Sequence, residues 1–389
     1  MARAAPAAPR PDAGTGPAAG ATPAGGRARP APVGFGERMP AFVAPTLERR
    51  DYASDTVAGR WNLLACLGRL DTPAARAALA RLSAAAGRFD PDHAIAFGFI
   101  HAAEDVAAAR AATRLPGLRF FVDAERVLAR LLGAATDAGE DRPVLILLDP
   151  QLRGLATAPV EAMQRMLESI ARLPPPHLHA GPLAHPPVLV VPRLFEPELC
   201  RALIAAFEAD GGEPSGFMRE VDGRTRLLHD PRHKRRRDMI VRDPALAAAV
   251  RERLNTRLVP EMARAFHFRA TRVERMLVAC YDAAEQGAFA PHRDNTTSGT
   301  AHRRFACTIN LNPQDYEGGD LRFPEYSSAT FRAPLGGAIV FSCSLLHEAL
   351  PVTGGRRYAF LPFFYDEAAA EIRRANNPRL GEEVGGYRG

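Results

Sequence analysis

The sequence predicts two domains of different class, a layered α/β domain followed by a domain of antiparallel β-strands. Two observations support this division of the 389 residues. From about residue 42 to residue 172, short apolar runs alternate with Ala-rich stretches of helical length. After residue 273 the pattern changes to short strands separated by the pairs Gly318-Gly319, Gly336-Gly337 and Gly354-Gly355. With 47% hydrophobic residues, the chain can bury a substantial core.

The N-terminal domain, residues 41–173, is expected to contain four strands that alternate with four helices. The expected strands cover residues 61–67, 94–100, 118–122 and 144–148. The expected helices cover residues 73–88, the stretch up to 111, 124–132 and 159–173. Because helices between strands cover the faces of a sheet, we expect a layered α/β domain.

Two segments flank this domain. Residues 1–40 are rich in Ala, Pro, Gly and Arg and have no apolar core, which predicts a disordered tail and no secretory signal. Residues 174–187 carry prolines at both ends, which predicts a stiff linker. The linker contains His177 and His179, but the prolines and the lack of a nearby carboxylate argue against a metal site.

The formal charge of +6 comes from arginine, since Lys234 is the only lysine. One dense basic cluster, Arg232 to Arg237, could meet nucleic acid or an acidic protein, or it could be a solvated or internally paired loop. The high arginine content alone does not single out a polyanionic partner, so we do not expect nucleic acid. No stretch approaches the ~20 apolar residues that cross a bilayer, so we expect no membrane partner.

The five cysteines are an odd number without a Cys-x-x-Cys pair, which is poor material for a disulfide framework. Four lie in apolar strand-like runs, where buried thiols are expected: Cys66, Cys280, Cys307 and Cys343. This cysteine usage suits a reducing compartment, and we expect a cytoplasmic protein.

The C-terminal domain, residues 188–389, is expected to begin with a strand at 188–191 and helices at 197–210 and 244–266. Short strands are expected at 275–281, 289–292, 305–311, 320–323, 338–342 and 358–364. Many short strands with Gly turns indicate an antiparallel sandwich or barrel, whose functional core we place at about residues 273–366.

The chain contains one His-x-Asp sequence, His292-Arg293-Asp294. Positions two apart on a strand project to the same face, so this imidazole and carboxylate are expected to converge. His347, after the expected strand 338–342, can supply a second imidazole, although it could also be a hydrogen-bonded loop histidine. Two histidines and one carboxylate form the facial triad of non-haem ferrous oxygenases, which leaves coordination positions open.

Arg357 stands ten residues after His347, at the start of the expected strand 358–364. A guanidinium group can grip a carboxylate at two points. Arg357 could therefore hold the far carboxylate of a 2-oxo acid whose other end binds the metal, with a further position open for dioxygen. Arg356 is adjacent but should point to the opposite face of the strand.

The motifs that carry a family resemblance follow one another between residues 280 and 358. They are Cys280-Tyr281, Pro291 to Asn295, Ile309 to Asn312, Gly318 to Glu325, His347-Glu348, Pro351-Val352 and Arg357-Tyr358. Together they resemble the prolyl 4-hydroxylase-type branch of the 2-oxoglutarate/Fe(II) oxygenases. The resemblance covers roughly residues 188–366 and is densest after residue 273.

This resemblance implies a double-stranded β-helix (jelly-roll) core with flanking helices. It also implies Fe(II) at the mouth of that core, bound by His292, Asp294 and His347. The reaction implied is oxidative decarboxylation of 2-oxoglutarate by dioxygen to succinate and carbon dioxide, coupled to hydroxylation of a second substrate. L-ascorbate is implied as a reductant.

The resemblance further implies that Arg357 binds the 2-oxoglutarate carboxylate. Tyr281 matches a position whose hydroxyl assists co-substrate binding, although an aromatic packing role stays open for it. Asn310 lies on a core strand where polar co-substrate contacts occur in the family.

In the N-terminal domain, looser motifs lie at Gly59-Arg60-Trp61, residues 118–123 and residues 142–150. They resemble the peroxiredoxin branch of the thioredoxin fold, over about residues 45–149. That family has a peroxidatic cysteine three residues after a threonine; here Thr72 is followed by Ala75. Without a thiolate there is no nucleophile for peroxide, and Cys66 is expected to be buried. We expect a degenerate thioredoxin-like domain that serves binding, docking or stability.

The leading hypothesis is a 2-oxoglutarate-dependent hydroxylase. A protein or peptide side chain of prolyl type is the first expectation for its substrate, a small metabolite is second, and nucleic-acid demethylation is third. The alternative is a non-catalytic interaction module with vestigial thioredoxin-like and jelly-roll domains, against which the retained metal triad and Arg357 argue. A thiol peroxidase would require peroxide consumption that depends on Cys66, which we do not expect.

Overall fold

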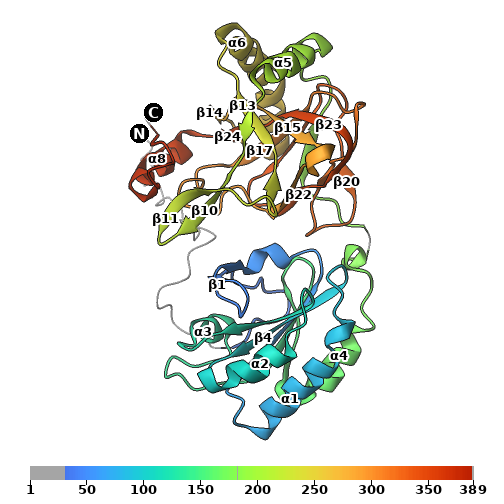
Figure 1. Cartoon of the computed structure of the whole chain (residues 1–389), viewed down its shortest axis with the longest axis vertical. Helices are drawn as coiled ribbons and strands as arrows, with labels where there is room; N and C mark the ends of the chain where they lie inside the picture. The colour runs from blue at the N-terminus through green and yellow to red at the C-terminus, as the bar shows by residue number, and fades with distance from the viewer. Residues whose placement is uncertain (1–30, 182, 388–389) are drawn as a thin grey trace, which may run out of the picture.

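The computed structural model describes residues 31–181 and 183–387 of the chain. An α/β body contains the N-terminal part, and a sheet-rich body contains the C-terminal part (Figure 1). Most of the predicted tail, residues 1–30, lies outside the described residues. Residues 31–40 differ from the prediction, because Val33 and Met39 are buried in the N-terminal core and Phe35 bridges to Gly154. They therefore belong to the N-terminal domain.

The N-terminal domain contains a five-stranded sheet in the order β5-β4-β3-β6-β7. Its strands are β3 Trp61–Gly68, β4 Ala94–Ile100, β5 Leu118–Val122, β6 Val144–Leu148 and β7 Gly154–Pro159. β3, β4 and β5 are parallel, whereas β6 and β7 pair antiparallel. The sequence pattern missed β7, because only Gly154 of this edge strand is buried and the strand has no apolar run.

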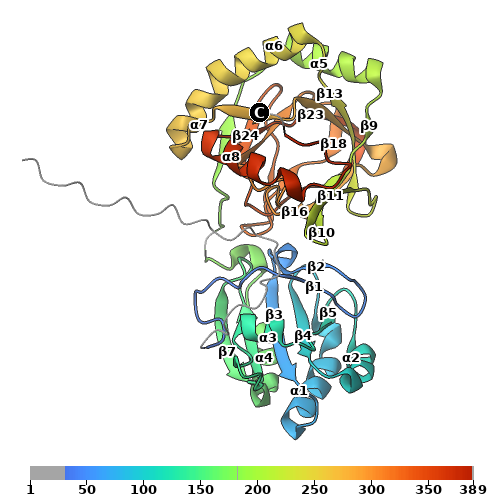
Figure 2. The same ribbon diagram turned by 90° about the vertical axis from the view of Figure 1, so that its left-hand side faces the viewer.

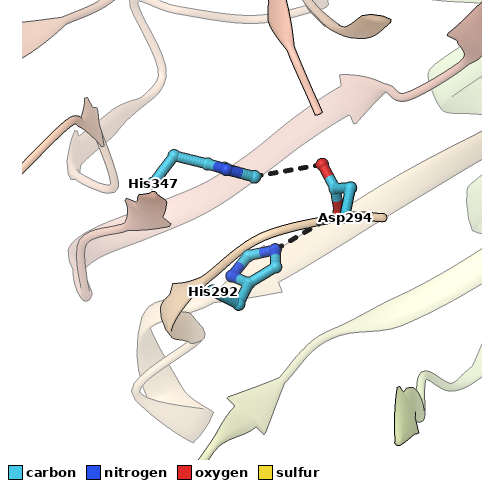
Figure 3. A group of neighbouring side chains, drawn as sticks. All are labelled: His292, Asp294 and His347. Atoms are coloured by element: carbon cyan, nitrogen blue, oxygen red, sulfur yellow. Dashed lines mark ion pairs between the residues drawn. The ribbon is translucent and has the colours of Figure 1, made fainter. Parts of the chain in front are cut away.

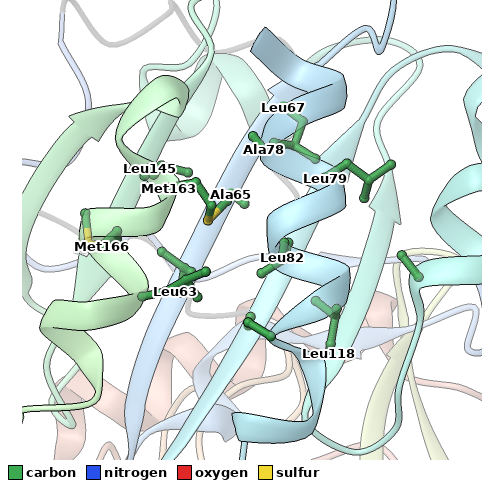
Figure 4. Packing of buried hydrophobic residues seen from close by; sticks show 14 of the residues in the cluster. Leu63, Ala65, Leu67, Ala78, Leu79, Leu82, Leu118, Leu145, Met163 and Met166 are labelled. Carbon is green, nitrogen blue, oxygen red and sulfur yellow. The ribbon is translucent and has the colours of Figure 1, made fainter. Parts of the chain in front are cut away.

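Helices cover this sheet on both faces, and they are α1 Pro73–Ala84, α2 Val106–Ala112, α3 Val127–Leu132 and α4 Met163–Ile170. α1, α2 and α4 pack on one face, as Figure 4 shows for α1 and α4, and α3 packs on the other with residues 33–58. Alternate residues of β3 supply the two cores, with Leu63 and Ala65 on one side and Leu64 and Cys66 on the other. Burial on both faces explains why the strands are continuous apolar runs.

The C-terminal domain contains two facing sheets, and every pairing between its described strands is antiparallel. The larger sheet comprises β8 Val188–Val191, β9 Glu213–Pro214, β13 Arg237–Ile240, β14 Arg272–Glu274, β15 Leu277–Asp282, β17 Phe305–Asn310, β18 Tyr316–Gly318, β21 Ala338–Ser342, β23 Val352–Phe360 and β24 Phe363–Tyr365. The smaller comprises β12 Lys234–Arg235, β16 Ala288–His292, β19 Leu321–Arg322, β20 Thr330–Phe331 and β22 His347–Ala349. The short antiparallel strands agree with the predicted sandwich or barrel.

Three helices cover the outer face of the larger sheet (Figure 2): α5 Pro197–Asp210, α6 Pro244–Arg253 and α7 Val259–Phe266. A π-helical turn, Leu254–Leu258, joins α6 to α7, so the predicted helical stretch 244–266 is one continuous run. α8, Glu367–Ala375, follows the last strand. No helix in the described part of the chain is both long enough and apolar enough to cross a membrane.

The two domains are in direct contact. The hairpin of β10 Phe217–Val221 and β11 Arg224–Leu228 extends toward the short strands β1 Val43–Ala44 and β2 Tyr52–Ala53 in both views (Figures 1 and 2). Arg219 of this hairpin donates to Asp51 at 2.5 Å. At Gly59, whose φ is +90°, an added Cβ would lie 2.6 Å from Pro324 Cβ, so only glycine permits this close approach.

Candidate metal and co-substrate site

The three predicted metal-binding side chains converge on one point (Figure 3). His292 ends β16, and His347 opens the neighbouring strand β22, where the two histidines are direct cross-strand partners. His292 Nε2 lies 3.5 Å from Asp294 Oδ1, and His347 Nε2 lies 3.3 Å from Asp294 Oδ2. In the described residues, this is the one group of three His, Cys, Asp or Glu side chains with metal-binding spacing.

Asp294 reaches this point by a different route from the one predicted. It does not share a strand with His292, because β16 ends at His292 and Asp294 lies in the turn that follows. The pairing of β16 with β22 is irregular between Phe289 and His292. The Asp294 N–H donates to the carbonyl of Cys343 at 3.0 Å. The convergence therefore depends on a strand end and a fixed turn, and not on side-chain alternation along one strand.

Both imidazole rings are oriented by their own backbone. His292 Nδ1 lies 2.8 Å from the carbonyl oxygen of Ala290, and His347 Nδ1 lies 3.0 Å from that of Leu345. Because a carbonyl can only accept, each Nδ1 carries the hydrogen. In the neutral ring, each Nε2 then presents a lone pair toward Asp294, which is the arrangement a metal ligand needs.

The electrostatics also suit a cation. Burial and then the neighbouring His347 lower the pKa of His292 to about 4, so its ring is neutral at pH 7. Burial acts to raise the pKa of Asp294, but His347 and His292 outweigh it and hold that pKa below its usual range. Two ligands that bind a metal at about 2.1 Å and at right angles are about 3.0 Å apart, close to the distances observed here. The residues fit a ferrous ion.

Arg357 is buried in the interior of the C-terminal domain, with 3% of its surface exposed. Its guanidinium carbon lies 5.0 Å from the centre of the Tyr281 ring, and the two residues are cross-strand partners of β23 and β15. Its Nε has no hydrogen-bond partner among the described residues. Arg356 points outward to Asp282, as strand alternation predicts. A buried, incompletely bonded guanidinium fits an incoming carboxylate.

The other two predicted co-substrate residues, Tyr281 and Asn310, differ in their surroundings. The Tyr281 hydroxyl accepts a hydrogen bond from Arg236 at 3.2 Å, which leaves its own hydrogen available. Asn310 is buried in β17, and its Nδ2 donates to the carbonyl of Ala333 at 2.8 Å. The Asn310 Oδ1 has no partner among the described residues.

A cavity of about 650 Å³ opens beside the metal-binding side chains. His292 and Asp294 line it, together with the β10–β11 hairpin, whereas Arg357, Tyr281 and Asn310 are not among the described residues that do so. One wall comes from the N-terminal domain and includes Phe42, Ala53 and Thr56. Sequence reasoning assigned no site residue to that domain.

The basic cluster Arg232–Arg237 is divided between surface and interior. Arg232 is exposed and bonds Asp230, whereas Arg236 is buried and bonds Asp238 through two nitrogens at 2.7 Å. Lys234 is also buried and lines the cavity. Internal pairing therefore explains much of the cluster. Sequence reasoning missed Lys234, because Lys234 lies in β12, Arg236 lies between β12 and β13, and their inward orientation depends on how these strands pair.

No thiolate site exists at the position where a peroxiredoxin would carry one. Ala75 is fully buried, and its N–H donates to the Thr72 hydroxyl at 3.1 Å, so Thr72 acts as the N-cap of α1. All five cysteines are free and buried. Burial raises the pKa of the Cys66 thiol far above its ordinary value, so this thiol is unreactive.

Comparison with known proteins gives a family match within the C-terminal domain. Residues 276–365 match the family model of the 2OG-Fe(II) oxygenase superfamily. A PKHD-type hydroxylase of Polaromonas sp. (strain JS666 / ATCC BAA-500) is 27% identical over 208 residues, which are 49% of this chain and 82% of that protein. A PKHD-type hydroxylase of Synechococcus sp. (strain JA-2-3B'a(2-13)) is 29% identical over 93 residues, or 22% of this chain.

The match to the Synechococcus protein spans 41% of that relative's length. Among solved structures, a prolyl-4-hydroxylase of Pseudomonas putida aligns with a TM-score of 0.35 and 18% identity, covering 46% of this chain and 92% of that one. The family match contains His292, Asp294, His347 and Arg357. The chain therefore contains a 2OG-Fe(II) oxygenase domain.

Proposed function

We propose that the chain is an Fe(II)- and 2-oxoglutarate-dependent dioxygenase that hydroxylates a second substrate and converts 2-oxoglutarate to succinate. The observation that carries this proposal is the combination of two features in one domain. His292, Asp294 and His347 offer a facial set of two nitrogens and one oxygen, and Arg357 offers a buried guanidinium whose Nε lacks a partner among the described residues. A facial triad leaves positions for a bidentate 2-oxo acid and for dioxygen.

In this proposal, each residue has a distinct task. His292 and His347 present Nε2 lone pairs, because the carbonyls of Ala290 and Leu345 hold the hydrogens on Nδ1. Asp294 supplies the carboxylate. When bound, Fe(II) would supply the open positions at which 2-oxoglutarate and dioxygen react.

The co-substrate contacts form a second set. Arg357 binds the distal carboxylate of 2-oxoglutarate, with the Tyr281 hydroxyl as an additional donor and Asn310 as a polar contact on a core strand. L-ascorbate belongs to the proposal as a reductant. Burial of Arg357 keeps water away from this ion pair, which strengthens it.

For the substrate, we propose a protein or peptide side chain of prolyl type first and a small metabolite second. The cavity of about 650 Å³ is large enough for either one side chain or a small molecule. The names of the similar proteins, PKHD-type hydroxylases, favour hydroxylation as the reaction. We propose no nucleic-acid substrate, because the cluster Arg232–Arg237 is partly buried and internally paired.

For the N-terminal domain, we propose a thioredoxin-like fold without thiol chemistry. The sheet order β5-β4-β3-β6-β7, with three parallel strands followed by an antiparallel pair, supports this. The competing proposal, a non-catalytic interaction module, has less support, because such a protein has no need for a buried arginine with an unused donor in the same domain as a metal triad.

The test is anaerobic loading with Fe(II), followed by titration with 2-oxoglutarate while the visible metal-to-ligand absorption band is recorded. We expect a band in the wild-type protein and, after oxygen is admitted, slow succinate formation without added substrate. Arg357→Ala should need about 10- to 100-fold more 2-oxoglutarate, because it loses a charge-assisted contact worth about 1.5–3 kcal/mol. Arg356→Ala, on the outward side of the same strand, is the matched control.

Iron binding without a 2-oxoglutarate band in the wild-type protein would contradict the proposed dioxygenase. The interaction module would then become the better explanation. Equal 2-oxoglutarate affinities in Arg357→Ala and Arg356→Ala would reject only the assignment of Arg357.

A further inference from the structure

Arg293 stands between two of the metal-binding residues and connects them to the N-terminal domain. Its side chain is 6% exposed. Its Nε donates to Asp55 of the N-terminal domain at 3.0 Å, and its terminal nitrogens donate to Glu325 at 3.0 and 2.9 Å. A buried guanidinium held by two carboxylates from different domains fixes the backbone between His292 and Asp294.

The strand that carries His347 is held by the same domain. Leu346 is fully buried, and it is a member of the hydrophobic core that Cys66 and Phe42 share in the N-terminal domain. The Leu346 N–H donates to Glu325 at 2.9 Å, and Glu325 also accepts from Arg38 of the N-terminal domain at 2.9 Å. Both backbone segments that carry the metal-binding side chains are therefore anchored across the domain interface.

We propose that the N-terminal domain is a positioning part of the oxygenase site. Through Asp55 and the core that receives Leu346, it sets the spacing of His292, Asp294 and His347, and with Phe42, Ala53 and Thr56 it closes one wall of the substrate cavity. This inference rests on the proposed metal site. It explains why a domain without thiol chemistry is retained beside the catalytic core.

The experiment compares two carboxylates of the same segment in the full-length protein. Asp55→Asn removes the negative charge that Arg293 contacts, whereas Asp51→Asn removes the charge that pairs with Arg219 across the interface, away from the metal-binding segments. Co(II) is titrated into each metal-free protein, and its visible spectrum reports both affinity and coordination geometry. Thermal unfolding of each metal-free variant gives its stability.

We expect Asp55→Asn to weaken Co(II) binding about tenfold and to change the Co(II) spectrum, as changes around metal ligands typically do. Asp51→Asn should bind like the wild type, and Asp55→Glu should recover part of the loss. Leu346→Val, a smaller change in the N-terminal core, should shift the spectrum in the same direction. If the wild type binds Co(II) and Asp55→Asn matches Asp51→Asn, this inference is wrong and the metal site stands. A wild type that binds no Co(II) overturns both.

A second, independent observation concerns Lys234, the only lysine in the chain. It is 6% exposed and lines the cavity together with His292 and Asp294. Its Nζ donates to the carbonyl of Gly216 at 2.7 Å and lies 4.7 Å from the centre of the Phe289 ring. No carboxylate in the described residues forms an ion pair with it. An ammonium group has three donor hydrogens, so two remain for a ligand.

The charges around Lys234 are unbalanced. Two neighbouring cations, Arg236 and Arg275, both bond the single carboxylate Asp238, at 2.7 and 3.2 Å. Burial and then the charge of Arg236 lower the pKa of Lys234, which an anion beside it would reverse. The geometry points to Lys234 as a carboxylate-binding residue of the cavity, for a carboxylate of either 2-oxoglutarate or the substrate.

The test of Lys234 rests on the proposed function and has two arms. The first arm titrates 2-oxoglutarate anaerobically into the wild-type protein, into Lys234→Met and into the adjacent control Arg235→Met. The second arm measures how strongly free amino acids, and then the corresponding amides, stimulate succinate formation by each protein. An approximately tenfold loss of 2-oxoglutarate affinity in Lys234→Met alone assigns the lysine to the co-substrate. Unchanged 2-oxoglutarate affinity with loss of a preference for acids over amides assigns it to the substrate. Identical behaviour of the two variants in both arms overturns the proposal.

Discussion

The two sheet systems of this protein bury very different side chains. The five strands of the N-terminal sheet contain one buried polar residue, Asn62, and otherwise bury apolar side chains. The strands of the C-terminal domain bury several polar and charged residues: Thr225, Lys234, Thr308, Asn310, His347, Glu348 and Arg357. Because burial of a polar group costs free energy unless it is well bonded, the buried polar groups of the C-terminal domain need bonded partners or a ligand, whereas the N-terminal interior gains stability from apolar burial.

The largest expected effect tests the functional side of this comparison. His292→Ala should abolish Fe(II) binding and 2-oxoglutarate turnover, because two ligands cannot retain the metal as three do. Far-ultraviolet circular dichroism and thermal unfolding should show a folded metal-free protein. His93→Ala, in the N-terminal domain, is the control and should retain full activity. Turnover that survives in His292→Ala would reject the metal assignment.

The next effect tests the structural side. Leu82 of α1 is fully buried in the N-terminal core, so Leu82→Ala should destabilise the protein by about 2–5 kcal/mol. Arg81→Ala, one residue away on the exposed side of the helix, should change stability by less than about 0.5 kcal/mol. Urea unfolding measures both. We expect Co(II) affinity to be unchanged in both variants while they are folded, and a loss with Leu82→Ala would show that the two interiors are coupled.

A smaller effect should appear with pH. Burial and then Arg219 lower the pKa of His233 to about 4, and its ring packs edge-on against Phe217 and Phe289. The pKa of His233 in the folded protein lies below the unfolded value of about 6.5. The contribution of the neutral, packed His233 ring to folding stability is therefore complete above pH 6.5 and is lost as the pH falls toward 4. His233→Leu should therefore reduce the loss of stability between pH 7 and pH 5 by about 1–2 kcal/mol in urea unfolding. An unchanged acid response would mean that the ring is more solvated than the structure indicates.

The smallest expected effect is no change at all. Cys66 is buried and its thiol pKa is raised, so Cys66→Ala should leave peroxide consumption at the background level of the wild type. A peroxidase assay with a thiol reductant measures this. Consumption that depends on Cys66 would restore the thiol peroxidase hypothesis and remove the contrast between the domains.

Local sequence patterns were sufficient for several features. Apolar runs predicted the strands β3, β4, β5 and β6 of the N-terminal sheet, because burial on both faces requires continuous hydrophobicity. The helix Pro197–Asp210 was predicted at its observed bounds. Residue type and spacing indicated the chemistry of His292, Asp294, His347 and Arg357. In the structure, the potential metal-ligand atoms of His292, Asp294 and His347 lie within 4.8 Å of one another.

Other features had no local signal. The edge strand β7 has exposed side chains, and residues 31–40 look like tail sequence until Val33 and Met39 meet the N-terminal core. The inward orientation of Lys234 and Arg236 depended on the pairing of β12 and β13 with their neighbours. A strand pairing that shifts by one residue would turn both side chains to the opposite face.

The sequence by itself predicted the class of each domain, the three metal-binding residues and Arg357, because periodicity and side-chain chemistry are local properties. The assignments of Tyr281 and Asn310 came from the family resemblance. Only the tertiary structure decided that Asp294 lies in a turn, that Asp55 pairs with Arg293 and that Leu346 enters the N-terminal core. Asp55 and Arg293 are 238 residues apart in the chain. Such contacts form only when the two domains dock. The docking depends on complementary packing and charge across the interface, which the local sequence pattern of either domain does not contain.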